Sequence, residues 1–499
     1  MDTSDVLVAG AGPTGLTLAC SLLLHGVSVR VVDRASGPAT TSRANFVHAR
    51  GSEVLNRLGA LGTLPDESLR AMKITTNLGD RPIMTLKFGD PGLRTAAPPM
   101  VVSQAKVEEA LRHRLARLGC APEWNRPLVD LQQDNDGVTA LVGDGDSVRA
   151  RWLVGCDGTA STTRKLAGIP FNGVKLSERF LLADAHLDWD LDRGGTTGWI
   201  HPTGLVGVMP MPDPDGREDL WRVFAYDPGY TEKPSEAEIL DRFRQILPLR
   251  TGRAVQISDP TWLSVFTVHR RLADRYRQGR VLIAGDAAHA HAPFGGQGML
   301  TGIGDAENLA FKLALVIRGR ADDAFLDTYQ AERRPLATTV LRGTSNVTRV
   351  NIVSNPLGRF VRDRIVVRLV GLPVIQRWAT YSASQLWVSY RKGPLGGRGR
   401  RPRPGDRVAD LPCVRADGAS SRLHTELSGR WALMVPQDGP VQGVAAEWLG
   451  DRVSVLRYDA KEAMLVRPDA HLAWRGAIDD TCGLERWLSK ALRHRRVGQ

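Results

Sequence analysis

Three glycines and one aspartate near the start of the chain have the spacing of a dinucleotide-binding turn. Gly10, Gly12 and Gly15 form the pattern G-x-G-x-x-G, and Asp33 closes the next apolar run. In such a turn the first glycine permits a tight bend, the second lets a pyrophosphate approach the backbone, and the third lets a helix pack closely on a strand. A carboxylate at Asp33 can accept hydrogen bonds from a ribose 2′-hydroxyl, which favours FAD or NAD over a 2′-phosphorylated nucleotide. Arg34, beside it, leaves the phosphorylated alternative open.

The residues around these glycines predict the strands and helix that such a turn needs. Residues 6–9 are apolar and lead into the first glycine, residues 16–23 carry apolar side chains at helical spacing, and residues 27–32 form a second apolar run. A helix that begins at the turn presents unsatisfied N–H groups and a positive dipole end to phosphates. This βαβ order favours a dinucleotide site over a purely structural glycine turn.

A second acidic turn lies much later in the chain. Residues 280–286 predict a strand that ends on Asp286, and a glycine loop from Gly295 to Met299 precedes a helix that we expect to begin near Gly302. A turn with an aspartate, a glycine loop and a helix N-terminus suit an electron-rich group. Phosphate is one candidate, and the pyrimidine edge of a reduced flavin is the other.

Several other polar residues are candidate ligand contacts. Arg43 and Arg50 lie in or beside a predicted loop and could reach an anionic ligand, although a solvated loop is an equal alternative. Gln104 is at the start of a predicted helix, where its amide could meet a ligand. His289 and His291 could act as an acid or a ligand, but packing or capping beside the glycine loop is the favoured interpretation.

The rest of the chain predicts further structural units. Residues 128–142 predict a hairpin, and residues 152–155 a buried strand that ends in Cys156-Asp157-Gly158. From about residue 175 to 264 the pattern changes to short strands with turn residues, which suggests an inserted sheet that would suit a substrate. After a Gly/Arg/Pro linker at residues 393–404, the order of strand, helix, strand, hairpin and helix suggests a small α/β module.

Length and composition limit the class of protein. A chain of 499 residues is too long for one ordinary core, so we expect a multidomain protein. The net charge of +12 comes without aromatic interleaving or a nucleic-acid recognition motif, so nucleic acid is not an expected partner. The polar start of the chain and the absence of long apolar runs predict no membrane association and a cytoplasmic protein. Five cysteines have neither disulfide-like nor metal-ligand spacing, and no metal site is expected.

Three separated motifs occur in a fixed order: the N-terminal G-x-G-x-x-G, Cys156-Asp157-Gly158, and Gly285-Asp286 within GDAAH, followed by GGQGM. This combination resembles the group A flavoprotein monooxygenases, the single-component aromatic hydroxylases built like para-hydroxybenzoate hydroxylase, over about residues 1–345. The C-terminal order, with Pro404-Gly405-Asp406 and residues 465–469, is similar to the thioredoxin-like extension of the larger bacterial members, many of which tailor aromatic polyketides.

The resemblance implies an α/β fold of the multidomain, α+β kind. A Rossmann-like FAD-binding domain with long helices would comprise residues 1–175 and 276–395. An inserted β-sheet domain for the substrate would comprise residues 176–275 together with about 72–100. A thioredoxin-like domain would comprise residues 403–499, without the C-x-x-C motif of thioredoxins.

The resemblance also implies a set of FAD contacts. The ADP half would be held by Gly10, Gly12, Pro13, Gly15, Asp33, Arg34, Arg43, Gln104 and Leu128; Asp157 and Gly158 would touch FAD and the incoming nicotinamide nucleotide; Asp286 would bind the ribityl chain; and Pro293, Gly298, Met299 and Leu300 would lie against the isoalloxazine. Arg50 and Pro293 are the candidate catalytic residues, with a plain surface arginine as the alternative for Arg50. Many relatives have asparagine where this chain has Leu300, so a side-chain contact is lost there.

The reaction implied by the resemblance begins with NADPH or NADH reducing the flavin. Dioxygen would then form a flavin C4a-hydroperoxide, which delivers one oxygen atom to an electron-rich aromatic substrate while the protein excludes water. The alternatives are Baeyer–Villiger oxygen insertion into a ketone, or a non-oxygenating reductase or halogenase. Residues 199–202 match the tryptophan motif of flavin halogenases only in part. More distant alternatives are a flavin-binding protein without turnover and a nucleic-acid-binding module. We expect a small-molecule aromatic substrate and a monomer or homodimer.

Overall fold

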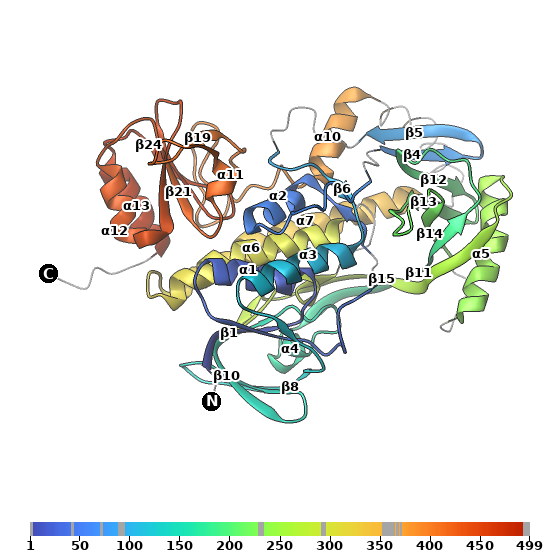
Figure 1. The fold of residues 1–499 in the computed structure, drawn as a ribbon, viewed down its shortest axis with the longest axis horizontal. Helices are drawn as coiled ribbons and strands as arrows, with labels where there is room; N and C mark the ends of the chain where they lie inside the picture. Colours follow the sequence, from blue (N-terminus) through green and yellow to red (C-terminus); the bar gives the residue numbers. More distant parts are fainter. Residues whose placement is uncertain are drawn as a thin grey trace.

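The structure, a computed structural model, describes residues 3–492 except 41–43, 70–72, 88–94, 228–233, 291–295, 352–364, 366–368 and 370–371. The described residues form a mixed α/β, multidomain fold. A central group of helices lies between an N-terminal sheet, a second sheet that extends to one side, and a C-terminal module on the other side (Figure 1).

The N-terminal sheet is mostly parallel, with the strand order β16-β17-β10-β1-β2-β7, and β9 and β8 continue antiparallel from β10. Its strands are β1 (Thr3–Ala9), β2 (Val29–Val32), β7 (Pro122–Glu123), β8 (Leu128–Gln133), β9 (Val138–Val142), β10 (Asp146–Gly155), β16 (Arg277–Gln278) and β17 (Val281–Ile283). In β1, Val6, Leu7 and Val8 are fully buried. Continuous apolar runs are typical of parallel strands that are covered on both faces. The predicted hairpin at 128–142 is confirmed.

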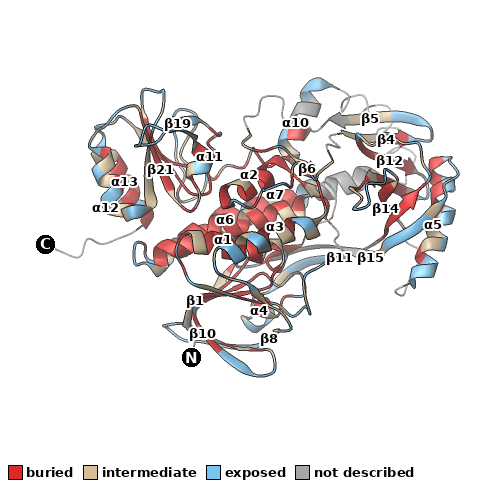
Figure 2. Cartoon of the chain, in the orientation of Figure 1, coloured by how far each residue is buried: buried red, intermediate tan, exposed pale blue. Residues whose placement is uncertain are grey.

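Several helices, some of them largely buried, lie next to this sheet (Figure 2). They are α1 (Pro13–Leu24), α2 (Ala49–Leu58), α3 (Gln104–Arg117), α4 (Thr162–Leu166), α6 (Gln297–Ile317) and α7 (Asp327–Asn351), with short 3-10 turns at Gly285–Ala287 and Asp323–Leu326. Helix α6 is apolar on most sides because it packs between α1, α2 and α7. Among the described helices, none combines the length and the apolar character needed to cross a membrane.

The second sheet has the strand order β18-β15-β11-β14-β13-β12-β4-β5. Its strands are β4 (Lys73–Leu78), β5 (Arg81–Lys87), β11 (Phe171–Leu187), β12 (Gly195–His201), β13 (Gly204–Pro210), β14 (Leu220–Tyr226), β15 (Ile257–Ala273) and β18 (His289–Ala290). The long strands β11 and β15 run side by side from the helices out to the side of the molecule (Figure 1). A two-stranded ribbon of β3 (Phe46–Val47) and β6 (Met100–Val101) lies near α2.

The prediction of strands alone between residues 175 and 264 is wrong for α5 (Glu236–Thr251), which covers one face of this sheet. Its start carries a capping box: the Ser235 hydroxyl accepts a hydrogen bond from the Glu238 N–H, and the Glu238 carboxylate accepts one from the Ser235 N–H. Serine followed three residues later by glutamate is the sequence pattern that could have found this helix. Phe243 and Ile246 bury its apolar face against the sheet.

The C-terminal module, residues 405–492, contains a sheet of order β20-β19-β22-β21-β23-β24. Its elements are β19 (Pro412–Val414), β20 (Ser420–Arg422), α11 (Leu423–Glu426), β21 (Trp431–Val435), α12 (Val441–Leu449), β22 (Val453–Arg457), β23 (Ala463–Val466), β24 (Leu472–Gly476) and α13 (Thr481–Leu492), and α10 (Pro373–Ala383) precedes the module. The predicted strands, hairpin and helices are confirmed between residues 431 and 492, and Arg493, at which the last helix is predicted to end, lies outside the described residues. The short elements between 412 and 426 were not predicted, because their apolar runs are too brief to show a period.

Candidate functional site

The chain leaves the parallel strands β1, β2, β10 and β17 at one edge of the N-terminal sheet. The Cys156 N–H donates to the Ala9 carbonyl (2.7 Å), and the Ala284 N–H donates to the Gly155 carbonyl (2.9 Å), so the strand ends are held side by side. The residues that follow these strands are Gly10, Asp33, Asp157 and Asp286. The fold therefore brings together turns that are far apart in the sequence, at the edge where open α/β sheets bind ligands.

The three glycines of the first turn have different surroundings. Gly10 has a φ of +109°, and a Cβ there would collide with the backbone of Cys156. A Cβ on Gly15 would overlap the carbonyl oxygen of Gly10, so this glycine lets α1 pack against the strand end. A Cβ on Gly12 would meet no atom of the described residues within 4 Å. Gly12 thus borders open space at the N-terminus of α1, whose first residue is Pro13.

Asp33 lies at the end of β2, directly beside this turn. Its Oδ2 accepts a hydrogen bond from the Ala11 N–H (2.6 Å), and its Oδ1 accepts one from the Ala35 N–H (2.8 Å). These bonds hold the half-buried carboxylate against the glycine turn and leave its further lone pairs for a hydroxyl donor. Arg34 is exposed to solvent.

The Asp157 turn is held together by its own side chains. The Asp157 carboxylate accepts hydrogen bonds from the Ser161 hydroxyl (2.5 Å) and the Thr163 N–H (2.9 Å). The Ser161 hydroxyl accepts one from the Arg164 N–H (2.9 Å) and so caps the start of α4. Gly158 has a φ of +78°. Arg164 donates to the Ala287 carbonyl (2.9 Å) and so ties this turn to the Gly285–Ala287 turn. Ser161 and Arg164 were not predicted as site residues, although a serine before a helix start is a capping signal.

The Gly285–Ala287 turn packs on the N-terminus of α1. A Cβ on Gly285, whose φ is +61°, would lie 2.5 Å from the Thr14 hydroxyl, so only glycine fits this approach. Asp286 is exposed at the same edge of the sheet. His289 is fully buried and its Nε2 lies 2.5 Å from the Asp305 carboxylate, which confirms the interpretation of His289 as a packed residue.

Helix α6 begins at Gln297, with Gly296 as its N-cap, so the expected start near Gly302 is wrong. Glycines such as Gly298 and Gly302 are typical of loops, but both of these residues belong to the helix. Gly302 is required there because a Cβ would collide with the Thr14 hydroxyl. Gly298 and Met299 are half-buried in the first turn, whose N–H groups have no intrahelical partner.

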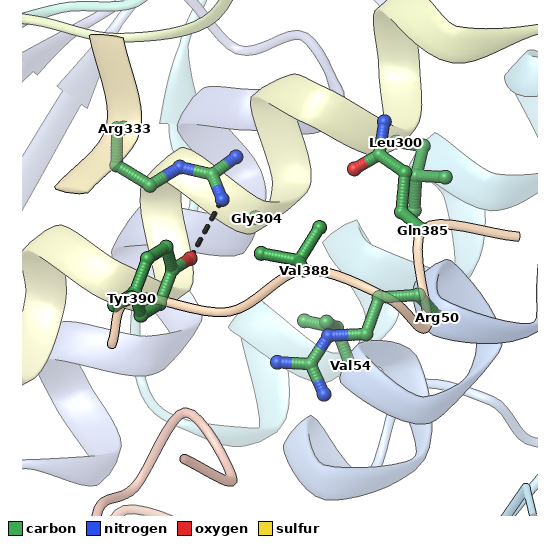
Figure 3. A pocket seen from close by; sticks show the side chains of 8 residues that line it. All are labelled: Arg50, Val54, Leu300, Gly304, Arg333, Gln385, Val388 and Tyr390. Atoms are coloured by element: carbon green, nitrogen blue, oxygen red, sulfur yellow. Dashed lines mark hydrogen bonds between the residues drawn. The ribbon is translucent and has the colours of Figure 1, made fainter. Parts of the chain in front are cut away.

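The side chain of Leu300 lines a small cavity (Figure 3). The cavity has room for about one water molecule, about 10 Å³. Its walls are formed by Arg50, Val54, Leu300, Gly304, Arg333, Gln385, Val388 and Tyr390. The side chain of Leu300 is therefore packed inside the protein, at the wall of this cavity.

Arg50 is not a surface arginine, because it is 7% exposed and lies in the first turn of α2. Its guanidinium pairs with Glu53 (3.2 Å) and Glu307 (3.2 Å) and donates to the Asp469 carbonyl (2.6 Å). Burial by itself would lower the pKa of Arg50, but the neighbouring carboxylates outweigh it and raise the pKa. Arg50 thus joins α2 and α6 to the C-terminal module.

Gln104 and Leu128 lie on elements that adjoin the Asp33 turn. Gln104 begins α3 as predicted, and its N–H donates to the Ala44 carbonyl (2.9 Å) while its amide donates to Glu108 (2.8 Å). Leu128 begins β8, is buried, and pairs with Val142 of β9. Arg43, His291 and Pro293 lie outside the described residues.

The turns at this edge fit a flavin dinucleotide. Gly12 leaves space at the positive end of α1, Asp33 offers a carboxylate beside it, and the start of α6 offers N–H groups. The positive end of α6 suits the electron-rich pyrimidine edge of the flavin ring. The structure thus places the space at Gly12, the Asp33 carboxylate and the N–H groups of α6 where the order of the sequence motifs predicts a dinucleotide.

Comparison with known proteins gives the same assignment. Residues 3–344 match the model of the FAD binding domain family, and residues 401–494 match that of the aromatic-ring hydroxylase C-terminal domain. A 6-methylpretetramide 4-monooxygenase from Streptomyces rimosus is 37% identical over 471 residues, which cover 89% of this chain and 81% of the relative. A rifampicin monooxygenase from Streptomyces venezuelae is 34% identical over 95% of both chains. The structure of the anhydrotetracycline hydroxylase OxyS from Streptomyces rimosus matches with a TM-score of 0.82 and 34% identity, over 98% of this chain and 99% of that one.

Proposed function

The chain belongs to the FAD-dependent aromatic-ring hydroxylases, the group A flavoprotein monooxygenases, and we propose that it hydroxylates an electron-rich polycyclic aromatic substrate of the polyketide class. The observation that carries this proposal is the shared edge where Gly10, Asp33, Asp157 and Asp286 follow neighbouring strands. The substrate class is supported by the relatives, whose names refer to pretetramide, anhydrotetracycline and rifampicin.

We assign the cofactor contacts to the turns of this edge. Gly10, Gly12, Pro13, Gly15, Asp33, Arg34, Arg43, Gln104 and Leu128 would hold the ADP half, Asp157 and Gly158 the middle of the cofactor, Asp286 the ribityl chain, and Pro293, Gly298, Met299 and Leu300 the flavin ring. Bound FAD would supply the redox chemistry: with NADPH or NADH as the reductant, one oxygen atom of O2 would go to the substrate and the other would leave as water. The first turn of α6 presents N–H groups and a positive dipole end, which stabilise negative charge on the ring.

The second sheet is our candidate for the substrate platform. Its strands alternate, so Leu181 and Val223 pack against α5 while Asp184 and Phe224 belong to the opposite face. Phe224 lies across Gly207, where a Cβ would collide with its ring. On the same face Asp184 and Arg222 form a buried bidentate pair (2.7 and 2.5 Å). A flat aromatic side chain beside a rigid polar pair suits a planar, oxygenated ring system.

We propose that the C-terminal module is a thioredoxin-like domain with a structural role. Its sheet and the helices α12 and α13 support this assignment, and the sequence contains no C-x-x-C. Burial raises the pKa of Cys413 to about 11, which makes it a poor nucleophile at neutral pH. Its β23–β24 hairpin inserts Arg467 into the helices, where Arg467 pairs with Glu332 (2.8 Å) on α7.

The proposed reaction is tested by incubating the FAD-loaded protein with NADPH, ¹⁸O2 and a panel of polycyclic phenols. The expected product carries one labelled oxygen as a ring hydroxyl, by mass spectrometry and NMR. A labelled ester oxygen would instead indicate Baeyer–Villiger insertion. NADPH oxidation without labelled product across the panel would contradict the proposal.

A further inference from the structure

One buried arginine contacts the helix whose first turn we assign to the flavin ring, and through one carboxylate it reaches the turn that we assign to the ribityl chain. Arg333 on α7 is 2% exposed, and its guanidinium donates three hydrogen bonds. Nε donates to the Asp305 carboxylate (2.6 Å), Nη2 to the Thr301 carbonyl (2.8 Å), and Nη1 to the Tyr390 hydroxyl (2.8 Å; Figure 3). The planar fork of an arginine can reach three acceptors in fixed directions, which a lysine cannot do.

Asp305 connects this arginine to the Asp286 turn. Its Oδ2 accepts hydrogen bonds from the Gly285 N–H (3.1 Å) and from His289 Nε2 (2.5 Å), so one carboxylate holds both ends of the turn. Burial alone would raise the pKa of Asp305, but His289 and Arg333 outweigh it and lower the pKa to about 2. The carboxylate is therefore ionised at neutral pH, and it accepts hydrogen bonds without donating any.

Thr301 connects the same arginine to the first turns of α6. Its hydroxyl donates to the Gln297 carbonyl (2.8 Å) and accepts from the Gln385 amide (3.0 Å). Gln385 also donates to the Gln297 side chain (2.7 Å). The start of α6 is thus held from outside the helix by Arg333 at the Thr301 carbonyl and by Gln385 at two side chains.

We propose that Arg333 and Asp305 are a positioning pair that sets the first turn of α6 relative to the Asp286 turn, and thereby the binding and reduction potential of the flavin. The pair acts through the Gly285 N–H and the Thr301 carbonyl, because both side chains are buried behind these elements. Asp305 and Thr301 both belong to α6, so loss of the fork would remove the group on α7 that orients the Asp305 carboxylate and holds the Thr301 carbonyl. The Gly285 N–H, from which this carboxylate accepts a hydrogen bond, could then shift relative to the first turn of α6. The N–H groups of α6 would then stabilise the reduced, negatively charged ring less well. This inference rests on the proposed function.

The test compares Arg333→Lys with Arg467→Lys as a matched control. Arg467 is as buried as Arg333 and pairs with Glu332, the neighbour of Arg333 on α7, but it belongs to the C-terminal module. The FAD dissociation constant of each apoprotein is measured by quenching of flavin fluorescence, and the midpoint potential by dye equilibration. Thermal unfolding reports the stability of each variant.

Arg333→Lys should weaken FAD binding at least about tenfold and lower the two-electron midpoint potential by about 30 mV, the equivalent of a tenfold change. Arg467→Lys should lose comparable thermal stability, with a dissociation constant within about twofold of the wild type and a potential shift below about 10 mV. Equal dissociation constants and potentials for the two variants would overturn the inference. Wild-type protein without affinity for FAD would overturn the proposed function as well.

A milder pair of variants decides the question if Arg333→Lys does not fold. Tyr390→Phe removes one of the three acceptors of Arg333, whereas Tyr458→Phe removes a hydroxyl that donates to the Glu462 carbonyl within the C-terminal module. The potential should fall by more than about 10 mV in Tyr390→Phe and stay unchanged in Tyr458→Phe. An unchanged potential in both variants would overturn the inference.

Discussion

Replacing Gly12 with alanine should separate cofactor binding from folding. The backbone at Gly12 has φ −76° and ψ −176°, an extended conformation that any residue adopts. A Cβ there would meet no described atom within 4 Å, so the protein itself has room for the methyl group. The same methyl group would occupy the space in which a pyrophosphate must approach the N–H groups of α1.

The expected magnitudes differ strongly between stability and binding. Alanine is a poorer N-cap than glycine by up to about 1 kcal/mol, but it also restricts the unfolded chain by about 0.4–1 kcal/mol, so the two effects nearly cancel. Displacing the pyrophosphate should remove about two charge-assisted hydrogen bonds of roughly 1.5–3 kcal/mol each. FAD should therefore bind about 10²- to 10⁴-fold more weakly.

Gly15→Ala is the matched control, because its Cβ would overlap the carbonyl oxygen of Gly10 and should prevent normal folding at a cost above about 4 kcal/mol. The assay combines thermal unfolding of the apoproteins with FAD titration followed by flavin fluorescence. Gly12→Ala protein that binds FAD within about twofold of the wild type would refute the assignment. So would Gly12→Ala apoprotein that fails to fold.

Four further outcomes are expected. Arg467→Met should lower the free energy of unfolding in urea by about 3–5 kcal/mol, because it leaves Glu332 and Asp469 buried without the arginine that pairs with both. Arg457→Met, at an exposed ion pair, should lower it by less than about 1 kcal/mol. Equal losses of stability in the two variants would contradict this. The pKa of Asp305 is lowered to about 2 in the folded state, below 3.8, so its stabilisation is complete above about pH 4 and is lost as the pH falls to about 2. Urea midpoints of Asp305→Asn should thus fall less steeply in this window than those of the wild type, and parallel profiles would count against the argument. The double variant Cys413→Ser, Cys482→Ser should keep its turnover within about twofold of the wild type, because no dithiol motif exists; a large loss with normal flavin content would show that the module takes part in redox chemistry. NADPH should reduce the flavin at least about tenfold faster when substrate is bound, a difference of about 1.4 kcal/mol in the barrier, and equal rates in anaerobic stopped flow would mean no gating.

Local sequence patterns predict the structure correctly where residues close together in the sequence determine it. The turn at the glycine motif, the 128–142 hairpin, and the strand and the helix between 431 and 449 are confirmed, because their spacing specifies a turn or a period over few residues. The start of α6 was misplaced because its glycines fit a loop equally well, and the contact of Gly302 with Thr14 that requires glycine is not local. Helix α5 begins with a local signal, the capping box of Ser235 and Glu238, but this signal lies between runs of residues that favour strands.

The sequence by itself determined that a dinucleotide turn, an Asp157 turn and an Asp286 turn occur in this order, because each depends on residue types at short spacing. Tertiary structure alone decided what surrounds the charged side chains. The residue type of Arg50 and its place in a predicted loop are compatible with exposure to solvent. In the structure, however, Arg50 is buried against Glu307 and the C-terminal module. Arg333 meets Asp305, Thr301 and Tyr390, which lie 28, 32 and 57 residues away. A charged residue has the same type whether it is solvated or buried, and its partners are set by the packing of distant elements.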